Sequence, residues 1–140
     1  MSGQAPVDFD QAIRDCIAKD DRYQPQAYHA VRLGLDHAQR IVHGEPRKGA
    51  RAQARSRHVS GPQMLEGFRL HVLETYGPLG YPLLQNWGIK RTADVGNIVF
   101  NLIGSGLFGK SDDDKPEDFA GVYDFREAFQ RPFEPTRRRG

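Results

Sequence analysis

The sequence predicts a single domain of the α+β class that is mainly helical. Apolar residues recur at three- and four-residue steps in four long segments, which is the spacing of one helix face. Short aromatic stretches between turn signals in the last third predict a β-hairpin. With 140 residues, 38% hydrophobic and 27% charged, one globular domain is expected. We expect it to span residues 8–130, between a disordered lead at 1–7 and a basic disordered tail at 131–140.

Two helices are expected before residue 45. The first carries an apolar stripe from Phe9 to Ile17 and ends at the acidic pair 20–21. Pro25 suits the first turn of the second helix, and Gly44 followed by a proline provides its stop signal. The apolar stripe of the second helix consists of Tyr28, Val31, Leu35, Ala38 and Val42.

Residues 44–58 are expected to form a flexible basic loop. The stretch has almost no large apolar side chain, so little of it can be buried with profit. It contains five basic residues and no acidic residue from position 47 onward, namely Arg47, Lys48, Arg51, Arg55 and Arg57.

Three further helices are expected between residues 60 and 105. Ser60 and Gln63 fit a capping box at the start of an amphipathic helix that ends near Gly77. Residues 79–87 predict a short helix with a left-handed glycine cap. Thr92 is expected to cap the last helix, which is the most apolar of the chain.

The order of these elements resembles a winged helix-turn-helix. In that interpretation residues 81–87 form the second helix, 88–91 the turn, 92–105 the recognition helix and 107–125 the wing hairpin. The alternative is a generic helical domain with an appended hairpin. We therefore expect two N-terminal helices packed on a winged-helix-like unit with a short C-terminal β-hairpin. The expected core consists of Ile13, Ile17, Val31, Leu35, Leu65, Phe68, Val72, Leu84, Trp87, Val95, Val99, Leu102 and Phe125.

Charge is strongly segregated behind a net charge of +2. Residues 111–136 hold eight acidic and three basic residues, whereas the basic loop and the three arginines near the C-terminus carry the opposite sign. Lys90 and Arg91 suit a DNA-reading helix, but Asp94 and the acidic turn at 112–118 oppose phosphates. The candidate residues for binding nucleic acid or a partner are Arg47, Lys48, Arg51, Arg55, Arg57, Lys90, Arg91, Arg137, Arg138 and Arg139.

No motif points to catalysis, a cofactor or a metal. One cysteine excludes an internal disulfide, and Cys16 lies on the apolar face of its helix, which favours core packing over nucleophilic chemistry. The five histidines lack ligand spacing, and the acidic turn fails the EF-hand pattern. We expect no catalytic, cofactor-binding or metal-binding residues. Because carboxylates distant in sequence can meet, a small enzyme with an unrecognised site stays a third hypothesis.

Several short motifs are similar to those of a known family. They are the stretches 57–61, 65–67, 87–92 with Asp94, 98–103 and 123–125. They resemble a family of small uncharacterised bacterial proteins largely restricted to planctomycetes and verrucomicrobia, over about residues 9–43 and 57–129. The resemblance implies a cytosolic bacterial protein of one domain, and it brings no activity and no site residues with it.

The leading hypothesis is a non-catalytic binding or adaptor protein. Its partner would be another protein or a second copy, since the basic loop of one copy can meet the acidic turn of the next. The alternative is nucleic-acid binding through the basic loop and the Arg tail. Such binding would be sequence-tolerant and directed to the phosphate backbone, because the loop has no aromatic residue on which bases can stack. No apolar run is long enough to span a membrane, and no secretory signal opens the chain. A cytoplasmic location is expected.

Overall fold

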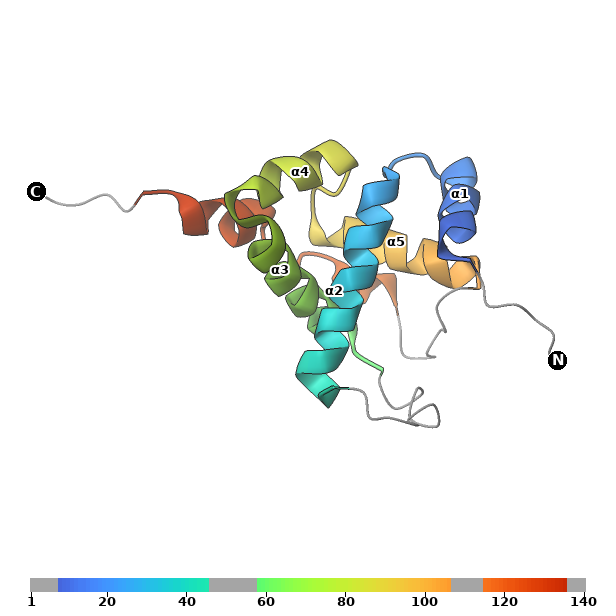
Figure 1. Cartoon of the computed structure of the whole chain (residues 1–140), viewed down its shortest axis with the longest axis horizontal. Helices are drawn as coiled ribbons and strands as arrows, with labels where there is room; N and C mark the ends of the chain where they lie inside the picture. The colour runs from blue at the N-terminus through green and yellow to red at the C-terminus, as the bar shows by residue number, and fades with distance from the viewer. Residues whose placement is uncertain (1–7, 46–57, 107–114, 136–140) are drawn as a thin grey trace, which may run out of the picture.

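The fold is a bundle of helices arranged around one central helix. The structure, a computed structural model, describes residues 8–45, 58–106 and 115–135. In these ranges the chain forms five α-helices, several short 3-10 or π turns and no β-strand. Figure 1 shows α2 running the height of the molecule, with α3 and α4 on one side of it and α1 on the other.

The first two helices follow the boundaries that the sequence predicts. Helix α1 spans Phe9–Lys19 and begins after Asp8, whose side chain accepts a hydrogen bond from the backbone of the first turn. Helix α2 spans Pro25–His43, with Pro25 in its first turn and Gly44 as its C-cap at a φ of 80°. The predicted start and stop signals of α2 are therefore confirmed.

The next two helices also match the sequence pattern. Helix α3 spans Gly61–Tyr76, and the predicted capping box is present, with Ser60 Oγ accepting from Gln63 N and Gln63 Oε1 accepting from Ser60 N. The 3-10 turn η2 (Gly77–Leu79) leads into α4, which spans Gly80–Trp87. Gly88 then adopts the predicted left-handed conformation at a φ of 98°.

Helix α5 spans Thr92–Gly104, but its N-cap is not the predicted one. Arg91 occupies the cap position, and Thr92 is the first helical residue. The Thr92 side chain is fully buried, and its hydroxyl accepts a hydrogen bond of 3.2 Å from Val122 N. Asp94 satisfies the N-terminus of α5 by accepting from the Lys90 and Arg91 backbone N–H groups at 2.9 and 3.2 Å.

The α+β class and the C-terminal β-hairpin are wrong for the part of the chain that the structure describes. Residues 115–125 contain the 3-10 turn η3 (Pro116–Phe119), and they are followed by η4 (Arg126–Gln130) and η5 (Arg131–Phe133). Residues 107–114, the expected first strand, lie outside the described ranges. Phe119, Phe125 and Phe129 are buried, Tyr123 is partly buried, and all four pack against the helical core from turns and short helical segments, not from a strand.

The predicted recognition helix is also wrong, because α5 lies inside the bundle. None of the residues from Thr92 to Ile103 is exposed. The helix packs against α1, α2, α3 and η3. A helix that reads base edges must offer a polar face to the major groove, and α5 has no such free face. The winged-helix interpretation therefore fails for both of its diagnostic parts.

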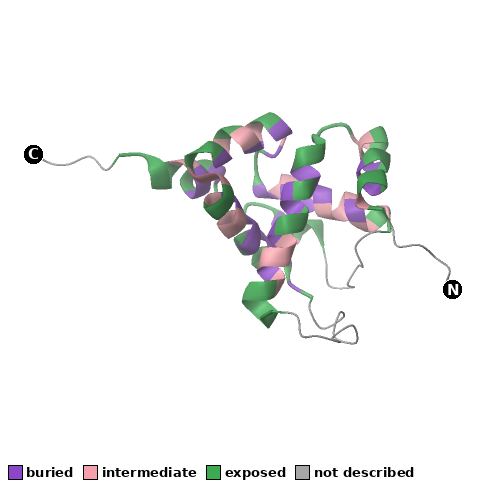
Figure 2. Ribbon diagram, in the orientation of Figure 1, coloured by how far each residue is buried: buried purple, intermediate pink, exposed green. Residues whose placement is uncertain are grey.

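The core that the sequence predicts is confirmed in its main features. Ile17, Leu35 and Val99 are partly buried and pack against the core, and every other predicted core residue is buried. Figure 2 shows buried positions, in purple, along α2, α3 and α5. The turn η5 occupies the first three residues of the expected disordered tail, and residues 136–140 lie outside the described ranges.

Helices α2 and α3 form the most extensive helix–helix contact among the described residues. A Cβ atom added at Gly34 of α2 would lie 2.8 Å from Phe68 Cα, and one added at Gly67 of α3 would lie 2.5 Å from Ala38 Cβ. Glycine at these two positions therefore allows the two backbones to approach more closely than larger side chains permit. This α2–α3 joint therefore sets the relative positions of the side chains on the two helices.

Candidate functional site

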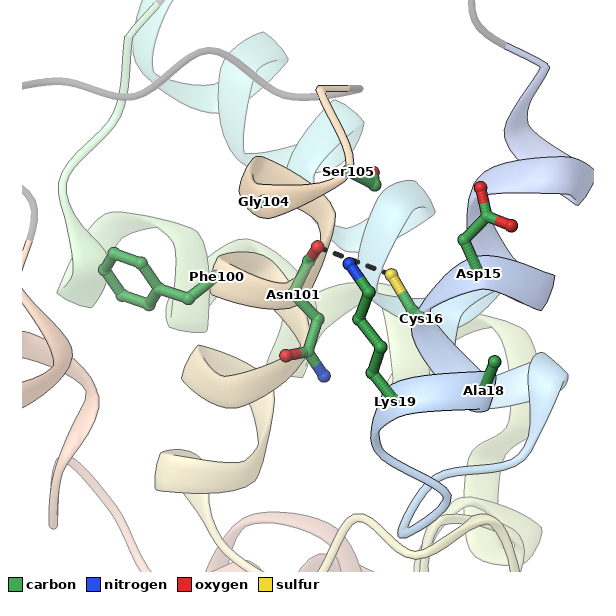
Figure 3. Close-up of a pocket in the computed structure, with 8 residues that line it drawn as sticks. All are labelled: Asp15, Cys16, Ala18, Lys19, Phe100, Asn101, Gly104 and Ser105. Carbon is green, nitrogen blue, oxygen red and sulfur yellow. Dashed lines mark hydrogen bonds between the residues drawn. The ribbon is translucent and has the colours of Figure 1, made fainter.

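A shallow recess of about 490 Å³ lies between α1 and α5. Figure 3 shows its lining, with α1 on one wall and the C-terminal turns of α5 on the other. The residues that line it are Asp15, Cys16, Ala18, Lys19, Phe100, Asn101, Gly104 and Ser105.

The thiol in this recess is held as part of the fold. Cys16 Sγ donates a hydrogen bond of 3.3 Å to the Asn101 carbonyl oxygen, and the residue is 5% exposed. Burial, followed by the nearby Asp15 charge, raises the pKa of the Cys16 thiol. A raised pKa reduces the thiolate fraction, which is the nucleophilic form. The prediction that Cys16 packs in the core is confirmed.

A row of polar side chains on α5 faces the connection between α1 and α2. Asp94, Asn97 and Asn101 follow one another at three- and four-residue steps along this otherwise apolar helix. Tyr23 Oη donates to Asp94 Oδ1 at 2.6 Å and accepts from Asn97 Nδ2 at 2.9 Å. Burial, with the hydrogen bond to Asp94 second, raises the pKa of the Tyr23 phenol.

The second half of this row binds the same connection through Asn101. Its Nδ2 donates to Asp20 Oδ2 and to Tyr28 Oη, both at 3.1 Å. Arg22 grips the same carboxylate with Nε at 2.8 Å and Nη2 at 2.7 Å. These Arg22 hydrogen bonds hold the pKa of Asp20 well below its ordinary range. The Asp20 carboxylate thus stays ionised, and it serves to pin the α1–α2 connection to α5.

The sequence alone gave no indication of these partners. The residues that meet are 71 to 81 positions apart in the chain, as in the pairs Tyr23–Asp94 and Asp20–Asn101. The only local signal is the spacing of three polar residues on the most apolar helix. That spacing indicates a narrow polar stripe whose side chains have partners inside the protein. The recognition-helix interpretation does not take this stripe into account.

Two of the predicted binding residues lie together in the structure. Lys90 and Arg91 are exposed in the connection between α4 and α5, and their side chains have no partner among the described residues. Arg22 lies on the same side, since Gly88 packs against its backbone carbonyl. The other predicted residues, Arg47, Lys48, Arg51, Arg55, Arg57 and Arg137, Arg138 and Arg139, lie outside the described ranges.

The basic segment 47–57 does not leave the body near Lys90 and Arg91. It follows the end of α2, whereas Lys90 lies near the start of that helix, where Gln24 N donates to the Trp87 carbonyl oxygen. A helix of 19 residues is about 28 Å long. At the exit of the segment, His43 Nε2 donates to the His58 carbonyl oxygen at 2.7 Å. The described residues next to this segment therefore lie at the opposite end of α2 from Lys90 and Arg91.

The histidines meet in a way that the sequence did not predict. His29 packs on Phe9, and His37 packs on His71 of α3. The His37 and His71 ring centroids are 6.5 Å apart, with the rings edge to face. Across the described ranges, no group of three or more His, Cys, Asp or Glu side chains is arranged to hold a metal ion.

The single tryptophan packs near this histidine pair. Trp87 is 8% exposed and contacts Tyr76 edge to face, with ring centroids 5.6 Å apart. Its predicted place in the core is therefore confirmed.

In the part of the chain that the structure covers, no helix has the length and apolar character of a membrane span.

Comparison with known proteins adds no likeness. No protein-family model, no curated protein and no solved structure matches the chain. The family resemblance drawn from short motifs therefore stays a prediction.

Proposed function

We propose that the protein is a non-catalytic binding protein whose outer α2 face docks a second copy of the chain. The observation that carries this proposal is the exposure of two large apolar side chains on that helix. Leu33 is 45% exposed and Ile41 is 51% exposed. They lie one turn on either side of His37, so the three residues follow one another along the helix.

The arrangement of this face supports self-association. In an antiparallel pair of α2 helices centred on His37, Leu33 of one copy faces Ile41 of the other. Asp36 and Arg40 lie one turn apart on the same helix and carry opposite charges, and Arg40 Nε lies 3.8 Å from Glu45 Oε2 of its own chain. A face that carries both charges in this order is complementary to itself when reversed.

The chemistry of the interior agrees with a binding role. The polar groups of Cys16, Tyr23, Asp94, Asn97 and Asn101 described above all have hydrogen-bond partners, and these bonds join α5 to α1, to α2 and to the connection between them. A cytoplasmic location is part of the proposal, because the one cysteine is a free buried thiol.

Sedimentation velocity over a concentration series tests the proposal. We expect the mass of the wild type to rise toward that of a dimer, and Leu33→Lys to weaken association at least tenfold, because a lysine charge replaces apolar contact in both copies. Leu79→Lys is the matched control, since Leu79 is 63% exposed on η2, away from α2. Equal association by both variants would contradict the proposed face.

A photo-crosslinking residue placed at position 33 or 79 tests the identity of the partner and the binding role separately. An adduct of position 33 with the chain itself in cells supports both. A discrete adduct with a different protein overturns the second copy and keeps the binding role. Absence of any adduct at position 33 beyond the position 79 control overturns both.

Sequence-tolerant nucleic-acid binding is the second candidate. The composition of segment 47–57, with five basic and no acidic residues, favours it. Neutralising about five phosphates predicts a log–log salt slope of about −4 for duplex DNA. Fluorescence anisotropy with duplex DNA and single-stranded RNA should show a salt-dependent affinity of this kind. Replacing the five Lys and Arg residues of segment 47–57 by Gln should reduce both the affinity and its salt dependence. A variant carrying Arg14→Gln and Arg126→Gln, two exposed arginines outside the predicted binding residues, is the control. No binding at moderate salt retires this candidate.

A further inference from the structure

His71 has a buried nitrogen atom that lacks a partner. Its Nε2 is enclosed and has no hydrogen-bond partner among the described residues. Its Nδ1 shares a hydrogen bond of 3.3 Å with Thr75 Oγ1, one turn later on α3. A neutral imidazole has one N–H and one lone pair, so an unpaired polar group stays at Nε2 in either tautomer. Such a group costs free energy in a folded protein and calls for an explanation.

The ring of His71 is one link in a chain of aromatic contacts that joins three helices. On one side it meets His37 of α2, and on the other it meets Tyr76 with ring centroids 6.4 Å apart. Tyr76 in turn contacts Trp87 at the end of α4. The position of this single imidazole is therefore coupled to the packing of α2 and to the environment of the only tryptophan.

The charged groups around His71 do not offer its Nε2 an acceptor. His37 of α2 contacts its ring, and Asp36 and Arg40 of α2 and Glu74 of its own helix are close enough to act on it electrostatically. Of the other elements that pack against this end of α3, η2 and α4 contain no charged residue, and η4 carries Arg126 and Glu127. Arg126 Nε donates to Gln130 Oε1 and Glu127 pairs with Arg131, so neither side chain is bonded to His71. A proton added to the ring would create a cation beside Arg40 and His37 with a buried N–H that nothing in the described ranges accepts.

We propose that His71 is a pH-sensitive latch of the α2–α3 joint. The neutral ring packs between His37 and Tyr76 and holds the joint closed. The protonated ring leaves this place for water and loosens the joint. The step adds one proton from solvent to the free ring nitrogen and breaks no covalent bond.

The direction of the pH effect follows from burial. Burial, with the neighbouring His37 second, lowers the pKa of His71 from its ordinary value of 6.5. The unfolded chain and the loosened state therefore bind the proton more tightly than the closed state does. The contribution to stability is complete above pH 6.5 and is lost as the pH falls through 6.5 toward the lower pKa of the closed state.

Urea unfolding followed by Trp87 fluorescence tests the latch. We compare the wild type, His71→Phe and His29→Phe at about pH 7.5 and about pH 5.5. In the wild type and in His29→Phe, the urea concentration at the unfolding midpoint should be lower at the lower pH. His29→Phe is the control because His29 packs on Phe9, away from the α2–α3 joint. His71→Phe keeps an aromatic ring without a proton site, so its midpoint should fall by clearly less. An equal fall in all three proteins overturns the proposal.

A second measurement does not depend on how the variants fold. Proton NMR of the wild type should show the His71 ring titrating below pH 6.5, with Tyr76 and Trp87 resonances shifting over the same pH range. A His71 ring that titrates at its ordinary value, or that titrates while Tyr76 and Trp87 stay unchanged, overturns the latch.

Discussion

Replacing Gly67 by alanine should weaken the fold, although the same change usually strengthens a helix. Gly67 lies inside α3, where alanine is favoured over glycine by about 1 kcal/mol. A Cβ atom at this position would lie 2.5 Å from Ala38 Cβ and 2.6 Å from Ala38 Cα and N. Ordinary contact between such atoms begins near 3.4 Å. The two helices would therefore have to separate by about 1 Å.

The magnitude follows from which atoms must move. Overpacking a tight interior costs about 1–3 kcal/mol, and the upper end applies here because two of the three atoms belong to the α2 backbone. Subtracting the gain in helix propensity leaves a loss of about 2 kcal/mol. Gly104→Ala is the matched control, since nothing lies within 4 Å of its added Cβ. The control should be neutral or more stable by up to about 1 kcal/mol.

Urea unfolding monitored by Trp87 fluorescence measures both variants. Combining Gly67→Ala with Ala38→Gly should restore stability only in part, because it removes the atom at 2.5 Å and leaves those at 2.6 Å. If Gly67→Ala is as stable as Gly104→Ala, the α2–α3 joint is not as close as argued, and the reasoning is refuted.

Two further substitutions test the polar row on α5. Tyr23→Phe removes the hydroxyl between Asp94 and Asn97 and should cost about 1–3 kcal/mol in the free energy of urea unfolding, whereas Tyr81→Phe, whose hydroxyl has no partner among the described residues, should be close to neutral. Asp20→Asn should lower stability at neutral pH, and the gap to the wild type in urea midpoint should narrow as the pH falls below the ordinary carboxyl value of 3.8, since the lowered pKa contributes stability only above that range. A gap that stays constant in acid would show that the Asp20 charge is not what Arg22 and Asn101 hold.

Local signals in the sequence are sufficient to predict most of the helices. The capping box at Ser60, the proline at the start of α2 and the left-handed Gly88 each act within a few residues, so their effect can be read directly. The β-hairpin prediction is wrong because aromatic residues are not specific to strands. Phe119 lies in η3 and Phe129 in η4, and both are buried against the helices.

The role of α5 was mispredicted although its sequence held the decisive signal. From Thr92 to Gly104 the helix has no basic residue and only Asp94, Asn97 and Asn101 as large polar side chains. A helix with so narrow a polar stripe is more typical of a buried element than of a DNA-reading one. The sequence alone does not identify the hydrogen-bond partners of this stripe. Tyr23, Asp20 and Tyr28 are distant from α5 in the chain and reach it only because of the way α1 and α2 pack against it.

The glycine contact and the histidine pair are two parts of the same joint, and this gives a last prediction. Gly67 and His71 lie one turn apart on the side of α3 that faces α2, so the approach that Gly67 allows also sets how deeply His71 is enclosed. Separating the helices in Gly67→Ala should admit water to His71 Nε2 and raise the pKa of this ring toward its ordinary value. In an NMR titration, His71 should then respond at higher pH than in the wild type, while Gly104→Ala should leave its titration unchanged. An unchanged His71 in Gly67→Ala would mean that the enclosure of the ring depends on its side-chain neighbours alone and not on the helix spacing.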